Sequence, residues 1–581
     1  MSTRAPKIVR DGWISQEGGI DNGVSPSLIQ PNQAAFAVNT TFRYGWPQPR
    51  PGWRKITINW QDSDDDEEAF KNALFQCAGG YVSDNRSGSL ISMHGGKVFR
   101  VKLDRGTNFT GQNISISGDL NPSNREEAWC AQGENFFVVQ DGQSLPFIYN
   151  GASARRANED EIPAARQIVY YMGRFWVARG REYLGGDIVF GPSGTAGSGF
   201  RDSVLKFTEA QYLTEGGSFG VPSDYGDITA MKPIGSINTA LGQGEMIVYT
   251  DSGAFATVIP QDRSTWKTTT QLLQRVIQLE EGAFSQSGVA SHNEDHFYRS
   301  RDGVRSLVYA VRNSGDPGNS SISAELGSIL DNENEEWLRF GSAVAFDNRL
   351  LVTASQGFVQ GRGVYHRGVV ALDFDPNNSV RRKLPPAWDG LWTGLNILRL
   401  VTVKHFGVKR CFAYVLNAQT QIELWEMTKD EKNDNDSTGD QRITWSVDSR
   451  SMPFGGKFDR KRLESADVFY DRLSGTVDFT AKYRPDNYPC WISWQTWQEC
   501  AKTSLCNEDI VACQDLPNLK EQYRLKKQLL QPSDDFDPIT KQLYRVGCEF
   551  QARTEVTGFC RLKQFRLNAR EVEEQEDGQQ L

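Results

Sequence analysis

The chain has 581 residues and a net charge of −9, from 64 Lys and Arg against 73 Asp and Glu. At roughly 150 residues per domain, this length predicts three or four domains, or two or three larger all-β units. Hydrophobic residues make up 38% of the chain and aromatic residues 11%, which excludes a mainly disordered chain. The acidic balance argues against a basic nucleic-acid-binding domain. Because no run of 18 apolar residues is present, no membrane-spanning segment is expected.

Residues 1–69 are expected to form an extended arm and the first strands. Five prolines favour an extended, non-helical backbone in this region, namely Pro26, Pro31, Pro47, Pro49 and Pro51. Such an arm either packs along its own domain or reaches a neighbouring subunit, and the sequence leaves both open. The acidic stretch 62–68 is expected to be a surface loop.

A turn containing Gly, Asn or Asp, followed by a short apolar run, recurs between residues 70 and 430. These turns centre on Gly95, Gly133, Gly173, Gly244, Asn293, Asn348 and Gly407. Their spacing straddles the roughly 40–50-residue period of β-propeller blades, and the longer intervals can hold loop insertions. We therefore predict an all-β protein with a β-propeller of about six or seven blades over residues 70–430. An irregular array of β-sandwiches is the alternative.

The remaining chain differs in character from the repeats. Residues 431–440 are acidic and polar and are expected to be a linker loop. Within residues 441–581, the segments 466–472, 475–484 and 543–570 alternate like strands. This predicts a β-rich, β-sandwich-like domain with a short helical, Cys-rich insert at 490–532. Within this insert, residues 515–531 have a helical pattern, and a second short helix is predicted for 269–280.

The nine cysteines do not form a recognisable metal motif. There is no CxxC pair, and no histidine follows His405. The first residues of the chain contain no apolar stretch, so no secretory signal is expected and reduced, buried thiols are the favoured interpretation. A zinc site and late-forming disulfides in the C-terminal region are the alternatives.

No motif supports a catalytic, cofactor-binding or metal-binding residue. A GxSxG match at 216–220 lacks the following helix of a nucleophile elbow. His292 and His296 are expected on a hairpin turn, and Asp434–Asp440 lacks the final glutamate of a calcium loop. The aromatic stretch 488–497 is expected to form a contact between domains or subunits, or a carbohydrate platform.

The N-terminal arm resembles a family of phage virion proteins. The resemblance rests on GGIDNGVSPSLIQPNQAAFAVN at residues 18–39, Arg43-Tyr-Gly, and Pro49-Arg-Pro-Gly-Trp53. Short C-terminal stretches beginning at Tyr483 and Thr557 add to it. This arrangement is similar to that of tail nozzle, or tail tubular protein B-like, proteins of short-tailed bacteriophages, which are propeller-based. On this resemblance, the expected interaction residues are Asn32, Gln33, Asn39, Arg50, Pro51, Gly52 and Trp53.

The resemblance implies a structural virion protein rather than an enzyme. Its copies would form a tail ring, expected to be a hexamer, that conducts and gates genomic DNA without specific recognition. The implied partners are a tail adaptor protein and tail fibres or spikes, and the implied location is the virion, after assembly in the host cytoplasm. Two alternatives remain, a propeller-type glycosidase or depolymerase, and a receptor- or carbohydrate-binding tail or neck protein that uses Trp491–Trp497.

Overall fold

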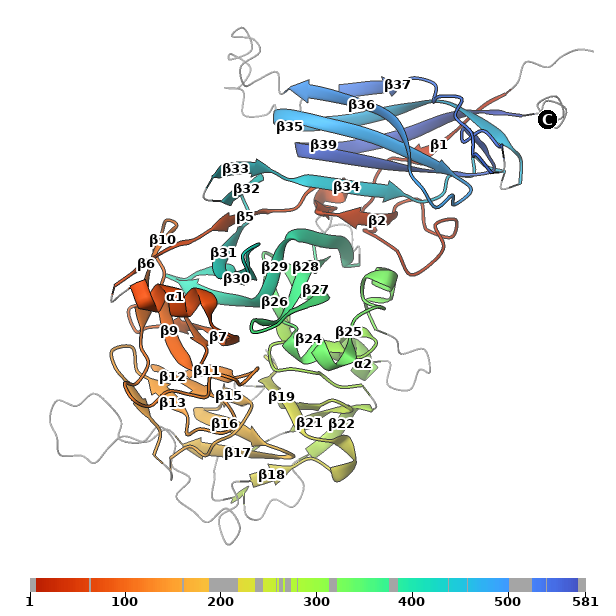
Figure 1. Cartoon of the computed structure of the whole chain (residues 1–581). Coiled ribbons are helices and arrows are strands. Elements are labelled where there is room, and N and C mark those ends of the chain that lie inside the picture. The colour runs from red at the N-terminus through yellow and green to blue at the C-terminus, as the bar shows by residue number, and fades with distance from the viewer. Residues whose placement is uncertain are drawn as a thin grey trace, which may run out of the picture.

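The computed structural model in Figure 1 shows a ring of small β-sheets beside one large curled sheet. It describes residues 7–572 except 62–63, 159–160, 188–217, 236–243, 258, 261–264, 267–272, 280, 313–320, 376–384, 437, 457, 501–524 and 540. No helix in this part of the chain is long and apolar enough to cross a bilayer.

Five small sheets form the blades of a β-propeller, so the predicted all-β propeller fold is confirmed. The first blade contains β6 (Thr57–Trp60), β7 (Phe75–Val82), β8 (Gly88–His94), β9 (Lys97–Lys102) and β10 (Asn108–Asn113). The second contains β11 (Trp129–Gly133), β12 (Phe136–Gln140), β13 (Phe147–Tyr149) and β14 (Ala154–Arg156). The third contains β15 (Ile168–Tyr171), β16 (Arg174–Arg179), β17 (Glu182–Asp187) and β18 (Ser218–Gly220). The last two contain β19 (Ile228–Pro233), β20 (Met246–Thr250), β21 (Gly253–Thr257) and β22 (Leu273–Leu279), then β23 (Val289–His292), β24 (Asp295–Ser300) and β25 (Gly303–Ser306).

The alternation of side chains along each strand explains how the blades stack. In β16, Phe175 and Val177 enter a core shared with the second blade. Trp176 and Ala178, which point to the opposite face, enter a core shared with the fourth blade. Both faces of a blade are therefore buried, as expected for a strand that is apolar at successive positions.

The large sheet closes the ring and continues into the C-terminal region. Its propeller side contains β26 (Ala343–Phe346), β27 (Arg349–Val359), β28 (Gly363–Asp373), β29 (Ala387–His405), β30 (Val408–Leu416) and β31 (Ile422–Thr428). β23 contacts β26, and β29 contacts β7, so this side of the sheet fills the gap between the fifth and first blades. The turns at Asn348 and Gly407 both belong to it, which is why five blades form rather than six or seven.

The C-terminal strands belong to this same curled sheet rather than to a separate sandwich. They are β34 (Thr444–Ser449), β35 (Lys461–Pro485), β36 (Ile492–Cys500), β37 (Leu525–Leu529), β38 (Val546–Gly547) and β39 (Phe550–Glu571). The N-terminal arm runs between the two regions (Figure 1). Its strand β1 (Ile8–Trp13) pairs with β39, β2 (Ala34–Val38) pairs with both β34 and β29, and β5 (Gly52–Lys55) pairs with β31.

Four local predictions were wrong. The acidic stretch expected to be a loop enters helix α1 (Asp64–Asn72), where carboxylates at the helix start are favourable and Phe70 is buried. The described part of the predicted helix 269–280 is strand β22. The described parts of the insert 490–532 that have regular structure are strands β36 and β37, and the predicted helix there lies mostly outside the described residues. The expected linker loop forms the hairpin β32 (Asn433–Asp436) and β33 (Gly439–Arg442).

Candidate functional site

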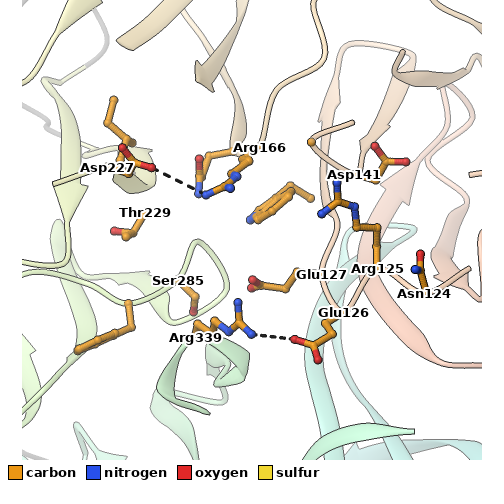
Figure 2. A pocket seen from close by; sticks show the side chains of 15 residues that line it. Asn124, Arg125, Glu126, Glu127, Asp141, Arg166, Asp227, Thr229, Ser285 and Arg339 are labelled. Carbon is orange, nitrogen blue, oxygen red and sulfur yellow. Dashed lines mark hydrogen bonds and ion pairs between the residues drawn. The ribbon is translucent and has the colours of Figure 1, made fainter. Parts of the chain in front are cut away.

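The main cavity lies at one end of the propeller ring, where the chain enters the inner strands of successive blades (Figure 2). Its volume is about 460 Å³. Glu126 and Glu127 precede β11, Arg166 precedes β15, and Asp227 precedes β19. Arg339, from the 3-10 helix η5 (Glu335–Phe340), lines the remaining side. We call this space cavity 1.

Charged side chains of both signs line cavity 1. Arg339 pairs with Glu126 at 2.8 Å, and Arg166 approaches Asp227 at 3.9 Å (Figure 2). All four side chains are about half exposed or more, so each pair contributes about 1 kcal/mol or less to stability. These four groups therefore make the cavity polar but add little to the stability of the propeller.

Glu127 is the lining carboxyl with the most unusual environment. Burial raises its pKa, and the charges of Arg399, Arg339 and Arg166 only partly offset this effect. Asp141 behaves in the opposite way. Burial would raise its pKa, but hydrogen bonds from Asn121 and from the turn after Asp141 outweigh burial and lower it. Glu127 is thus a candidate proton donor, and Asp141 is a structural anchor.

A second cavity, of about 200 Å³, adjoins the first and shares Glu126 and Arg339 with it. We call it cavity 2. Arg362 and Arg399 also line it, together with the aromatic rings of Phe75, Trp337, Phe340 and Phe358. Neither cavity contains a residue that the sequence predicted as functional.

The predicted interaction residues form a junction inside their own chain. The Asn39 amide donates to the Thr444 carbonyl, and its Oδ1 accepts from the Thr393 N–H. Arg50 is buried and donates to both carboxylate oxygens of Asp434. This junction joins the arm to β29, to β34 and to the β32–β33 hairpin.

Neighbouring residues of the arm complete this packing. Trp53 is buried, and its N–H donates to Asp434. At Gly52, an added Cβ would lie 2.1 Å from the Asn433 carbonyl oxygen, so only glycine fits there. The Arg50 guanidinium also donates to the Pro51 carbonyl. Within the arm, the Gly18 N–H donates a hydrogen bond to the Asn32 carbonyl, and the Gln33 side-chain amide donates one to the Gly18 carbonyl.

The other motifs also have structural roles. His292 and His296 flank the hairpin turn between β23 and β24, and His296 is buried. In the aromatic stretch, Trp494 and Trp497 pack against the C-terminal core. Trp491 lies between the guanidinium groups of Arg484 and Arg553, at 4.5 and 4.4 Å from its ring centre. Trp491, Trp494 and Trp497 therefore all have packing partners within the chain.

Six of the nine cysteines have described side chains, and all six are free thiols. Cys77 on β7 hydrogen-bonds with Cys130 on β11, the inner strand of the next blade. Within the described residues, no group of three His, Cys, Asp or Glu side chains is arranged to hold a metal ion. Cys506 and Cys513 lie outside those residues, and the side chain of Cys500 is not among the described ones.

Comparisons with known proteins give no functional assignment. No known protein family and no curated protein matches the sequence. Among solved structures, the chain is similar to BamB from Moraxella catarrhalis, at 11% identity and a TM-score of 0.30, over 64% of this chain and 86% of that one. It is also similar to the computationally designed Ika8 protein, at 10% identity and a TM-score of 0.28, over 64% and 99%. Likeness at this level carries no argument about function.

Sequence reasoning missed the cavity residues for a physical reason. Glu127 and Arg399 are 272 positions apart, and neither stands in a motif. Only the closure of the ring between β7 and β29 brings them near each other.

Proposed function

We propose that the chain is a structural component of a phage tail, a ring-forming nozzle or tube protein that conducts and gates genomic DNA. In this proposal six copies form the ring, and the ring contacts a tail adaptor protein and tail fibres or spikes. The protein performs no chemistry. It acts in the virion, after assembly in the host cytoplasm.

One observation carries this proposal. The residues behind the resemblance, above all Asn39, Arg50 and Trp53, join the propeller to the C-terminal part of the large sheet. Because these residues connect two regions of one chain, the motif is typical of an architecture and not of a surface patch. The resemblance therefore supports a shared architecture, and ring contacts would use other surfaces.

Cavity 1, of about 460 Å³, has no role as a DNA passage in this proposal. In this proposal the lumen lies between copies in the ring, not along the axis of one propeller. A net charge of −9 suits such a conduit, because acidic walls do not hold phosphates.

Immunogold electron microscopy tests the proposal. Particles from the phage that carries this gene are incubated with an antibody raised against the purified chain. We expect gold particles at the tail, and we expect particles made without the chain to lack the distal tail segment. Intact particles without label, from lysates in which the chain is abundant, would contradict the proposal.

A propeller-type hydrolase acting on a polysaccharide is a second candidate, favoured by Glu127. Its raised pKa suits a general acid, and Asp227 supplies another carboxylate to the same cavity. Purified protein is tested against a polysaccharide panel by reducing-end release. Activity lost in Glu127→Gln but kept in Glu126→Gln, whose carboxylate pairs with Arg339, would favour the hydrolase over the tail protein.

A further inference from the structure

Arg399 differs from every other buried arginine in the described chain. Eight arginines there are buried, and seven form an ion pair with Asp or Glu, namely Arg50, Arg299, Arg305, Arg349, Arg410, Arg545 and Arg561. Arg399 is 9% exposed. No carboxylate of the described residues lies within ion-pairing distance of it, and its Nε has no hydrogen-bond partner among them.

An unpaired buried guanidinium carries a large free-energy cost. Removing it from water forfeits its hydration, and only an opposite charge with matched hydrogen bonds repays that loss. The nearby groups Glu127, Cys77 and His366 interact with Arg399 only electrostatically. The protein thus keeps a costly charge that the side chains of its described residues leave without a direct partner.

Cavity 2 provides the space that a partner for Arg399 would need. Arg399 lines its wall together with Arg339 and Arg362. The two carboxylates of the lining are Glu126, which is held by Arg339, and Glu336. Three guanidinium groups against two carboxylates leave a positive excess. The volume of about 200 Å³ is several times the roughly 30 Å³ that one water occupies in the liquid.

We propose that cavity 2 is a binding site for a small oxyanion, a phosphate or carboxylate group, held by the Arg399 guanidinium. The planar fork of arginine donates two parallel hydrogen bonds to such groups. Arg362 is the second donor, because its present bonds go to the Thr420 carbonyl and the Asn72 side chain rather than to a carboxylate. This site is independent of the proposed tail function.

Thermal unfolding and isothermal titration calorimetry test the site. Sodium phosphate or sodium acetate replaces sodium chloride at constant ionic strength and pH 7. We expect a saturable rise in Tm of the whole chain with one of the two anions. A larger effect of phosphate identifies a phosphate site, and a larger effect of acetate identifies a carboxylate site.

Arg399→Met is the decisive variant. We expect it to weaken anion binding by about 10-fold or more, the usual value of a charged hydrogen bond. Its Tm in anion-free buffer should equal or exceed that of the wild type, because a buried unpaired charge is removed.

Arg299→Met is the matched control, because Arg299 is equally buried but pairs with Glu333 at 2.7 Å. It should lower the Tm and keep the anion response. If that variant does not fold, Arg125→Gln, at an exposed residue of cavity 1, serves as the second control.

Three results would overturn the proposal. One is a folded wild-type chain that shows no saturable response to either anion. Another is a wild-type response in Arg399→Met, which would mean an adventitious ion only, bound elsewhere. The third is a strong loss of stability in Arg399→Met without anion, which would show that the charge is structural.

Discussion

Arg50 and Asp434 lie 384 positions apart, yet the guanidinium of Arg50 donates two hydrogen bonds of 2.8 Å to the Asp434 carboxylate. The Arg50 side chain is 2% exposed. The same guanidinium donates to Asn39 and to the Thr393 carbonyl of β29. This one side chain therefore ties the N-terminal arm to the propeller and to the start of the C-terminal region.

Breaking this pair should destabilise the whole chain. Arg50→Met leaves the Asp434 carboxylate without its main partner. A fully buried pair typically costs about 3–5 kcal/mol to break, and we expect less here because the Asp434 side chain is 27% exposed. Urea unfolding followed by tryptophan fluorescence measures the loss. The matched control is Arg442→Gln, which breaks the exposed Arg442–Asp478 pair and should cost about 1 kcal/mol or less. Equal losses in the two variants would contradict a special role for the junction.

Acid should destabilise the propeller through its buried histidines. Burial lowers the pKa of His94 and of His296 to about 3, and that of His366 to about 4. The unfolded chain binds these protons near pH 6.5 and the folded chain does not, so stability is lost as the pH falls below 6.5. Each group contributes a slope of up to about 1.4 kcal/mol per pH unit. The free energy of unfolding, measured by urea unfolding between pH 7.5 and 5, gives this slope. His94→Gln should lower the slope by the contribution of one histidine, up to about 1.4 kcal/mol per pH unit. An unchanged slope in that variant would argue against His94 staying uncharged in the folded chain over this pH range.

Glu325 should change the pH dependence of stability in the opposite direction, so that stability is lost as the pH rises. Burial, together with the charge of Asp21 in the arm, raises its pKa to about 7. Its ionised form is therefore disfavoured in the folded state, so the penalty grows as the pH rises from about 4.5 to 7. Glu325→Gln should gain about 2 kcal/mol at pH 8 and little at pH 4. The exposed Glu335→Gln is the control, and a gain of the same size at both pH values would refute the titration.

The adjacent thiols of Cys77 and Cys130 should form a disulfide between the first two blades. Diamide accepts the two electrons and two protons that the thiols lose and becomes the hydrazine. The new bond closes a loop of about 53 residues, which predicts about 4 kcal/mol of stabilisation from chain entropy. Peptide mass spectrometry should find the cross-link in the wild type and in Cys411→Ser, but not in Cys130→Ser. Finding only mixed products with other cysteines would show that the strands hold these thiols apart.

Local features of the fold could be predicted from the sequence, and the reason is geometric. The turns at Gly95, Gly173 and Gly407 need a positive φ, and all three glycines have one. Such turns join neighbouring strands, so the hairpins follow from a few adjacent residues. The acidic stretch before Phe70 was misjudged because charge alone does not distinguish a loop from a helix whose single aromatic residue is buried.

The all-β class, the propeller and the positions of the hairpin turns could thus be predicted from the sequence, because these depend on local backbone preference and on strand alternation. The blade count depended on tertiary structure, since the hairpins at Asn348 and Gly407 join one sheet through distant pairing. The tertiary structure also decided that the buried Arg50 pairs with Asp434 and that Arg399 has no such partner among the described residues. Burial and ion pairing depend on which distant segments meet, and one sequence read alone does not contain that information.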